Sequence, residues 1–268
     1  MCIRDRCNQI WINFVISSFK FVTFNPNMMI VSHMHQFIFI KTRKTAGTSV
    51  EIILSRDCGP YDIITPIQKI DEDKRSKLGH IGPQNYKIRK FKFLNILRKS
   101  LGFKLGLKLL EHYNHSPAKI IRKRINNHDF DNYFKFCIVR NPWDRIVSEY
   151  YWLLNGPGKG RWPEGKTFSE FIQESNAALL SDSHIYMIDG KPAVDRFIKF
   201  ENLDIELNKC LKDLGITNIE LPHAKSGTRK TKAHYSLLYD ETSLNKVNEI
   251  CAWEIDHFGY TFEDNRQL

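Results

Sequence analysis

One short segment of the sequence has the residue types that bind phosphate groups. Arg43 and Lys44 supply positive charge, and a run of small and hydroxylated residues follows them: Thr45, Ala46, Gly47, Thr48 and Ser49. Small residues let the main chain approach a phosphate closely, and hydroxyl groups add hydrogen-bond donors. The segment therefore indicates a phosphate-binding loop, although a solvated turn explains an isolated Gly-Thr-Ser at least as well.

A second segment offers another pair of anion-binding groups. Arg140 follows an apolar run, and Ser148 comes eight residues later, on a stretch with helical character. A guanidinium fork and a hydroxyl group can together bind a second phosphate. The alternative is an ion pair between Arg140 and Asp144 at the start of that helix, and the segment alone leaves both interpretations open.

Both segments follow a predicted buried strand and precede a predicted helix. Residues 36–41 and 133–139 are short apolar runs rich in aromatic and β-branched side chains, which is typical of buried strands. Helices are expected over 50–54 and 145–154, and Pro142 suits the first turn of the second one. Anions bind in open α/β sheets where a strand ends and the next helix begins, because free N–H groups point there.

The rest of the chain continues this alternation. A third strand is expected over 194–200, and helices are expected over 167–174, 204–214 and 243–258, with Gly215 and Gly259 as stops. Strands that alternate with helices predict an α/β fold with a mainly parallel sheet and helices on both faces.

Length and charge bound the organisation of the chain. With 268 residues and 42% hydrophobic content, the chain can bury one sizeable core. We interpret residues 34–268 as one domain and residues 1–33 as an extension upstream of a start at Met28 or Met29. The net charge is +10, and residues 87–124 hold 12 basic residues and one acid. This excess of positive charge favours an anionic partner. Three interpretations of this basic insert remain open: a lid over an acidic acceptor, a helix on a membrane surface, or a core helix with a solvated basic face.

Cysteine usage and hydropathy indicate the compartment. The six cysteines are scattered, with no C-x-x-C pair and no accompanying histidine spacing of a zinc site. This pattern is typical of a reduced, cytoplasmic protein. The apolar stretch 11–24 contains Asn13 and Lys20 and is shorter than the roughly 20 residues that cross a bilayer, which leaves open a short N-terminal anchor.

Together the two phosphate-binding segments resemble the PAPS-dependent sulfotransferases, in particular their carbohydrate-type branch (PAPS is 3′-phosphoadenosine 5′-phosphosulfate). The matching motifs are Lys-Thr-Ala-Gly-Thr-Ser at 44–49 and Val-Arg-Asn-Pro-x-x-Arg at 139–145, with Ser148 on the next helix. Further similarity lies at 112–118, 197–203, 221–235 and 258–262. The resemblance thus covers the chain from about Gln36 to Phe262 and implies a P-loop-like sulfotransferase fold.

The resemblance implies a role for each segment. Residues 44–49 would bind the 5′-phosphosulfate, and Lys44 would stabilise the charge that grows on the bridging oxygen as the sulfuryl group leaves. Arg140 and Ser148 would bind the 3′-phosphate, and Arg229, in a third motif, would lie on the same side. The donor would be PAPS, no metal would be needed, and the acceptor would be a hydroxyl group, which we expect to belong to a glycan.

The attacking hydroxyl group needs a base, and the resemblance favours His115. This residue stands in a His-x-x-Ala context shortly before the second phosphate-binding strand, as in the family. A neutral imidazole, with an ordinary pKa of about 6.5, can accept a proton at physiological pH. His80, between Gly79 and Gly82, is the second candidate.

Two other classes of function compete with this interpretation. A P-loop kinase would also wrap phosphates with a strand, a loop and a helix, but the sequence has no G-x-x-x-x-G-K-[ST] motif, and Lys44 precedes Gly47 instead of following it. A non-catalytic protein could bind nucleic acid through the basic insert, and its affinity would then depend strongly on salt. The combined motifs favour the sulfotransferase, for which we expect no nucleic-acid partner.

Overall fold

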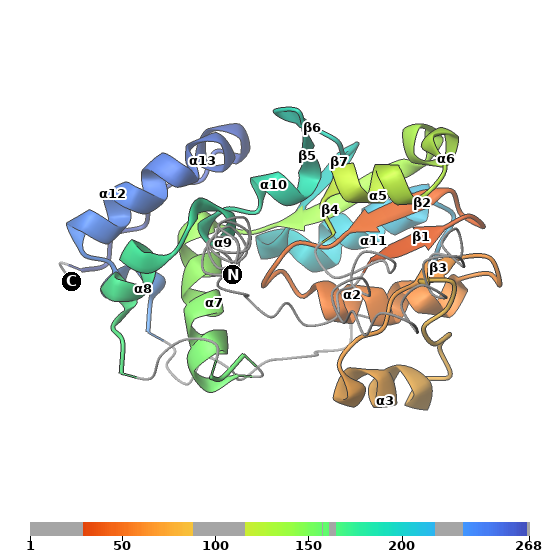
Figure 1. Cartoon of the computed structure of the whole chain (residues 1–268), viewed down its shortest axis with the longest axis horizontal. Helices are drawn as coiled ribbons and strands as arrows, with labels where there is room; N and C mark the ends of the chain where they lie inside the picture. Colours follow the sequence, from red (N-terminus) through yellow and green to blue (C-terminus); the bar gives the residue numbers. More distant parts are fainter. Residues whose placement is uncertain (1–28, 88–115, 157, 161–164, 218–232, 267–268) are drawn as a thin grey trace, which may run out of the picture.

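The computed structural model describes residues 29–87, 116–156, 158–160, 165–217 and 233–266 (Figure 1). Five of its strands form a central sheet in the order β3-β1-β2-β4-β7. These strands are β1 (Ile30–Ser32), β2 (Phe37–Ile40), β3 (Ile63–Ile64), β4 (Phe134–Val139) and β7 (Arg196–Lys199). A separate two-stranded ribbon consists of β5 (Met187–Ile188) and β6 (Lys191–Pro192). The predicted strands at 36–41, 133–139 and 194–200 are therefore confirmed as β2, β4 and β7.

The central sheet is mixed, which corrects the expected mainly parallel arrangement. β2, β4 and β7 pair in parallel, whereas β1 is antiparallel to both β2 and β3. The reason lies in the connection between β1 and β2, which spans only residues 33–36. Parallel neighbours need a crossover of a dozen or more residues, and a connection of this length therefore allows only an antiparallel hairpin.

The first strand also moves the expected domain boundary. Met29 and Ile30 are fully buried, and the main-chain N–H of Met29 donates to Thr65 Oγ1 at 2.6 Å. From the sequence, residues 1–33 were expected to be an extension outside the domain. The sheet includes residues 30–32 of that segment, and the packed core therefore starts no later than Met29.

Helices and 3₁₀ turns connect and cover the strands. The α-helices are α2 (Gly47–Leu54), α3 (Lys69–Lys77), α5 (Ala118–Arg124), α6 (Asn127–Asn132), α7 (Pro142–Asn155), α8 (Phe168–Glu174), α9 (Ala177–Leu180), α10 (Ser183–Tyr186), α11 (Leu203–Asp213), α12 (Glu241–Ile250) and α13 (Ala252–Phe258). The 3₁₀ turns are η1 (Ser55–Asp57), η4 (Phe200–Asn202) and η5 (Tyr235–Leu238). Pro142 is in the first turn of α7, as expected.

Hydrophobic cores lie on both faces of the sheet. Phe37, Phe39 and Phe136 pack with α2 and α11 on one face, and the alternate residues Ile38 and Cys137 pack with α5, α6 and α10 on the other. Figure 1 shows α2 on one side of the strands and α5 and α6 on the opposite side. This alternation follows from the two-residue period of a strand, and it establishes an α/β fold with helices on both faces.

A third core joins the helices at one end of the molecule. Buried side chains of α7, α8 and α12 pack together there, away from the strands (Figure 1). Thr167 caps α8 in a full capping box with Glu170. The single helix expected over 243–258 is instead two helices that meet at Cys251, and the second ends at Gly259, where φ is 65°. Across the described ranges, no helix is long and apolar enough to span a membrane.

Candidate functional site

The two predicted phosphate-binding segments contact each other at one edge of the sheet. β2 and β4 are parallel neighbours, so the loops that follow Ile40 and Val139 emerge side by side. The Thr42 hydroxyl donates to the carbonyl oxygen of Ile138, and Arg140 Nη1 donates to the carbonyl oxygen of Lys44 at 2.7 Å. The structure therefore brings residues 42–49 and Arg140 into one site, although they lie about a hundred positions apart in the sequence.

The loop between β2 and α2 has an uncommon main-chain conformation. Lys44 and Ala46 both have φ near 58°, in the left-handed region, and neither is a glycine. Such residues cost on the order of 1–3 kcal/mol each, and they persist where the surroundings hold them. Ala46 is also the N-cap of α2, and no side chain caps this helix start. Free N–H groups at a helix start attract anions, which matches the predicted role of the loop.

Behind the loop, a buried ion pair fixes the first turn of α2. Lys41 Nζ lies 3.0 Å from both Glu51 Oε2 and Thr48 Oγ1, and the Lys41 and Glu51 side chains are almost fully buried. Gly47 makes this possible, because a Cβ at that position would lie 2.6 Å from Lys41 Cγ. Gly47 is thus required by a side chain inside the protein, in addition to any close approach by a ligand.

Lys44 projects from the loop towards α7. Its Nζ lies 5.3 Å from the centroid of the Trp152 ring, within the range of a cation–π contact. Gly158 packs on Trp152 so closely that a Cβ there would lie 2.5 Å from the indole ring. The sequence patterns did not identify Trp152 as a residue beside the site. The glycines that follow it, at 156 and 158, were a sign that the main chain packs closely on a large side chain there.

Arg140 adopts the ion pair that the sequence left open as the alternative. Its Nε lies 3.0 Å from Asp144 Oδ2, and its guanidinium stacks 4.3 Å from the centroid of the Phe200 ring. Glu201 Oε1 accepts from the main-chain N–H of Asn141 at 2.7 Å, so Glu201 has a structural role. Ser148 is half-buried on α7, two turns beyond Arg140. Arg140 is thereby held rigidly against the loop.

Arg43 lies close to the loop, but its side chain is engaged elsewhere. Its main-chain N–H and its Nε donate to Asp182 at 2.8 and 2.6 Å. Its Nη2 also donates to the carbonyl oxygens of Ala178 and Ser181. These contacts anchor Arg43 to the turn that carries Asp182, and its assignment to donor binding stays a prediction.

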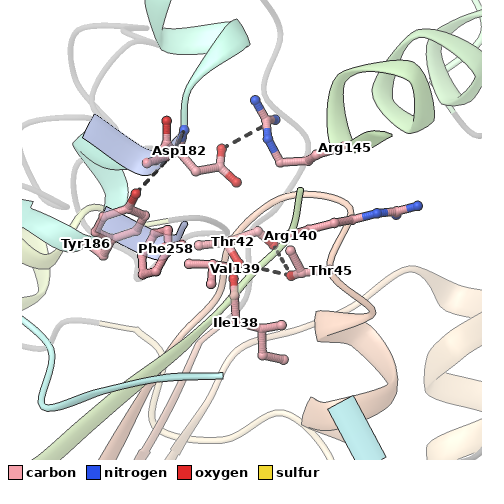
Figure 2. A pocket seen from close by; sticks show the side chains of 10 residues that line it. Thr42, Thr45, Ile138, Val139, Arg140, Arg145, Asp182, Tyr186 and Phe258 are labelled. Atoms are coloured by element: carbon pink, nitrogen blue, oxygen red, sulfur yellow. Dashed lines mark hydrogen bonds and ion pairs between the residues drawn. The ribbon is translucent and has the colours of Figure 1, made fainter. Parts of the chain in front are cut away.

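A small pocket lies beside the two loops (Figure 2). Its lining residues are Thr42, Thr45, Ile138, Val139, Arg140, Arg145, Asp182, Tyr186, Glu254 and Phe258. Figure 2 shows Arg145 pointing towards Asp182, whereas Arg140 points away from it. Burial is the largest single influence on the pKa of Arg145 and lowers it, but the nearby acidic groups, Asp182 first, together outweigh burial and raise that pKa. Burial raises the pKa of Glu254.

Of the two candidate bases, only His80 lies within the described residues. His115 and Arg229 lie outside the described residues, and so does most of the basic insert. His80 Nδ1 lies 2.7 Å from the carbonyl oxygen of Ile52 on α2. A carbonyl oxygen only accepts, so Nδ1 carries the proton, and in the neutral ring Nε2 is the nitrogen that can accept one. The hydrogen bond thus makes Nε2 the nitrogen through which His80 would act as a base.

Among the residues that the structure describes, no three His, Cys, Asp or Glu side chains are grouped to hold a metal ion.

Comparison with known proteins decides the family. The statistical model of the sulfotransferase family matches residues 27–261, which include both loops, Arg140 and the whole sheet. The chain belongs to the sulfotransferase family. It is therefore a transferase, and the family moves sulfuryl groups. An uncharacterized protein of Archaeoglobus fulgidus is 29% identical over 103 residues, covering 37% of this chain and 82% of the relative. No solved structure matches the chain significantly.

The Gly47 contact generates a testable prediction about this sulfotransferase. Gly47→Ala should lower the free energy of unfolding by roughly 1–3 kcal/mol, because the new methyl group would displace the buried Lys41 side chain. Urea unfolding measures the effect. The matched control is Gly82→Ala, where nothing lies within 4 Å of the added carbon. Equal stability of the two variants would contradict the described packing.

Proposed function

We propose that this sulfotransferase uses PAPS as its donor and transfers the sulfuryl group to a hydroxyl group of a carbohydrate acceptor. One observation carries the donor assignment: Arg140 Nη1 donates to the carbonyl oxygen of Lys44 at 2.7 Å, which joins two anion-binding elements in one site. PAPS carries phosphate groups at two ends, and the two elements would bind one each. The carbohydrate acceptor rests on the sequence resemblance.

The loop between β2 and α2 supports the 5′-phosphosulfate end of this assignment. Residues 44–49 pass from a buried strand into a helix whose start has no side-chain cap. The N–H groups there and the hydroxyl of Thr48 would surround the phosphosulfate. Lys44 would neutralise charge on the bridging oxygen as the S–O bond breaks, and its contact with Trp152 keeps the ammonium group beside the loop.

The transfer itself is a single displacement. The acceptor oxygen forms a bond to sulfur while the bond from sulfur to the bridging oxygen breaks, and adenosine 3′,5′-bisphosphate leaves. The proton of the hydroxyl group passes to a histidine. His80 is held by Ile52, which lies five residues into α2, about 8 Å along the helix axis from Gly47. This places His80 near the same helix as the phosphate-binding loop, and His80 stays a rival to His115.

The donor assignment predicts how nucleotides stabilise the protein. Adenosine 3′,5′-bisphosphate should raise the melting temperature, and ATP with Mg²⁺ should not, because a ligand of the folded state adds to its stability. Arg140→Ala should weaken the bisphosphate far more than adenosine 5′-phosphosulfate, which lacks the 3′-phosphate. The control is Arg122→Ala, whose guanidinium also pairs with one carboxylate, that of Asp131. Equal losses for both ligands would refute the 3′-phosphate assignment.

The proposed role of Lys44 predicts a loss of turnover. Lys44→Ala should reduce kcat by about 10²-fold or more, since it removes a positioned charge that acts mainly in the transition state. Transfer of a labelled sulfuryl group to the acceptor measures the effect. The control is Lys209→Ala, at an exposed position on α11. A folded Lys44→Ala protein with nearly normal kcat would remove Lys44 from the mechanism.

Two histidine variants assign the base. Our prediction from the sequence is that His115→Ala retains donor affinity and loses turnover by about 10²–10⁴-fold, while His80→Ala chiefly raises the acceptor KM. The wild-type rate should also fall as acid protonates the base. If His80→Ala abolishes turnover at saturating acceptor while His115→Ala remains active, the base is His80.

A further inference from the structure

Asp182 links the two phosphate-binding elements from the side opposite Arg140. It lies between α9 and α10 and is only 4% exposed. One of its carboxylate oxygens accepts the main-chain N–H of Arg43 at 2.8 Å, and the other accepts Arg43 Nε at 2.6 Å. The carboxylate therefore fixes both the main chain and the side chain of the residue that immediately precedes Lys44.

The same carboxylate contacts the helix that follows Arg140. Arg145, on α7, has its Nη1 3.7 Å from Asp182 Oδ1, and its side chain is only 4% exposed. Arg145 Nη2 donates to the carbonyl oxygen of Leu180, just before the Asp182 turn. Asp182 thus lies between an arginine of the first element and an arginine of the second.

The turn that carries Asp182 is itself fixed from the C-terminal part of the chain. Glu254, on α13, accepts from the main-chain N–H of Asp182 at 3.2 Å, from the Ser181 hydroxyl at 2.8 Å and from the Tyr186 hydroxyl at 3.1 Å. Because Glu254 fixes the turn, the carboxylate of Asp182 has little freedom to follow a movement of the loop between β2 and α2. Such a movement would instead break the contacts between Arg43 and Asp182.

We propose that Asp182 is a positioning residue for sulfuryl transfer, which holds the main chain at Arg43 so that Lys44 keeps its left-handed conformation beside α7. Asp182 binds the N–H just before Lys44, and Arg140 binds the carbonyl oxygen of Lys44, so the residue is held on both sides. This inference rests on the proposed function. It also gives Arg43 its role, as the group through which Asp182 acts.

The test is a double-mutant cycle on Asp182→Asn and Arg43→Met. Kinetics are measured with PAPS and unsulfated chondroitin, and also with water as the acceptor, alongside the Kd for adenosine 3′,5′-bisphosphate. Each single variant should lower kcat/KM for PAPS by about 10–100-fold, because a misplaced loop misaligns the reacting groups. The double variant should be no worse than Asp182→Asn, because Arg43→Met removes only the side-chain part of the contact with Asp182, which Asp182→Asn also disrupts.

A matched control separates positioning from general stability. Asp195 accepts the main-chain N–H of Lys135 at 2.7 Å and pairs with Lys135 Nζ at 3.1 Å, at the opposite end of β4 from the site. Asp195→Asn should shift the melting temperature and leave kcat and KM unchanged. Asp182→Asn should change kcat/KM even where its melting temperature matches that of the control.

Several outcomes would overturn the proposal. A folded Asp182→Asn protein with wild-type kcat and KM would do so, and so would additive effects, which would mean that Arg43 binds the donor directly. If Asp182→Asn does not fold, Asp182→Glu takes its place, because it keeps the charge and moves the carboxylate by one methylene group, and wild-type kinetics in that variant refute the positioning role. A wild-type protein that the bisphosphate does not stabilise would instead refute the proposed function.

Discussion

The parallel pairing of β2 with β4 is the constraint on which the site depends. It places the ends of both strands at one edge of the sheet, where Thr42 and Arg140 reach across to the main chain of the other segment. A one-residue change of register would move Ile38 and Ile40 to the wrong core and shift the two loops relative to each other. The packing of the interior and the assembly of the site are therefore one requirement.

Around that edge, each of four basic side chains contacts a carboxylate of the protein. Lys41 pairs with Glu51, Arg140 with Asp144, and Arg43 and Arg145 share Asp182. Removing one partner of a buried pair leaves an uncompensated charge, which is far more costly than losing an exposed pair. These pairs make the loop rigid, and they leave the ammonium group of Lys44 on the side that faces α7 and Trp152.

Sequence patterns predicted what depends on local chemistry. The runs 36–41 and 133–139 identified the strands, and the small and hydroxylated residues after Lys44 identified the loop. The patterns could not show that β1 belongs to the sheet, because a three-residue strand has too few residues to reveal a period. Asp182 was also out of reach, since its partner Arg43 lies 139 positions away and no local spacing relates them. Cys251 interrupts the helical pattern without a proline or glycine to mark the break.

The burial of Met29 has a consequence for how the protein is produced. Its main-chain nitrogen is enclosed and donates a single hydrogen to Thr65 Oγ1. An expression plasmid whose first codon encodes Met29 would replace that amide with a free α-ammonium group, and a charge in so enclosed a place is strongly unfavourable. A plasmid that begins at Met28 or earlier keeps an ordinary peptide bond there, so a single codon separates a tolerated terminus from a disruptive one.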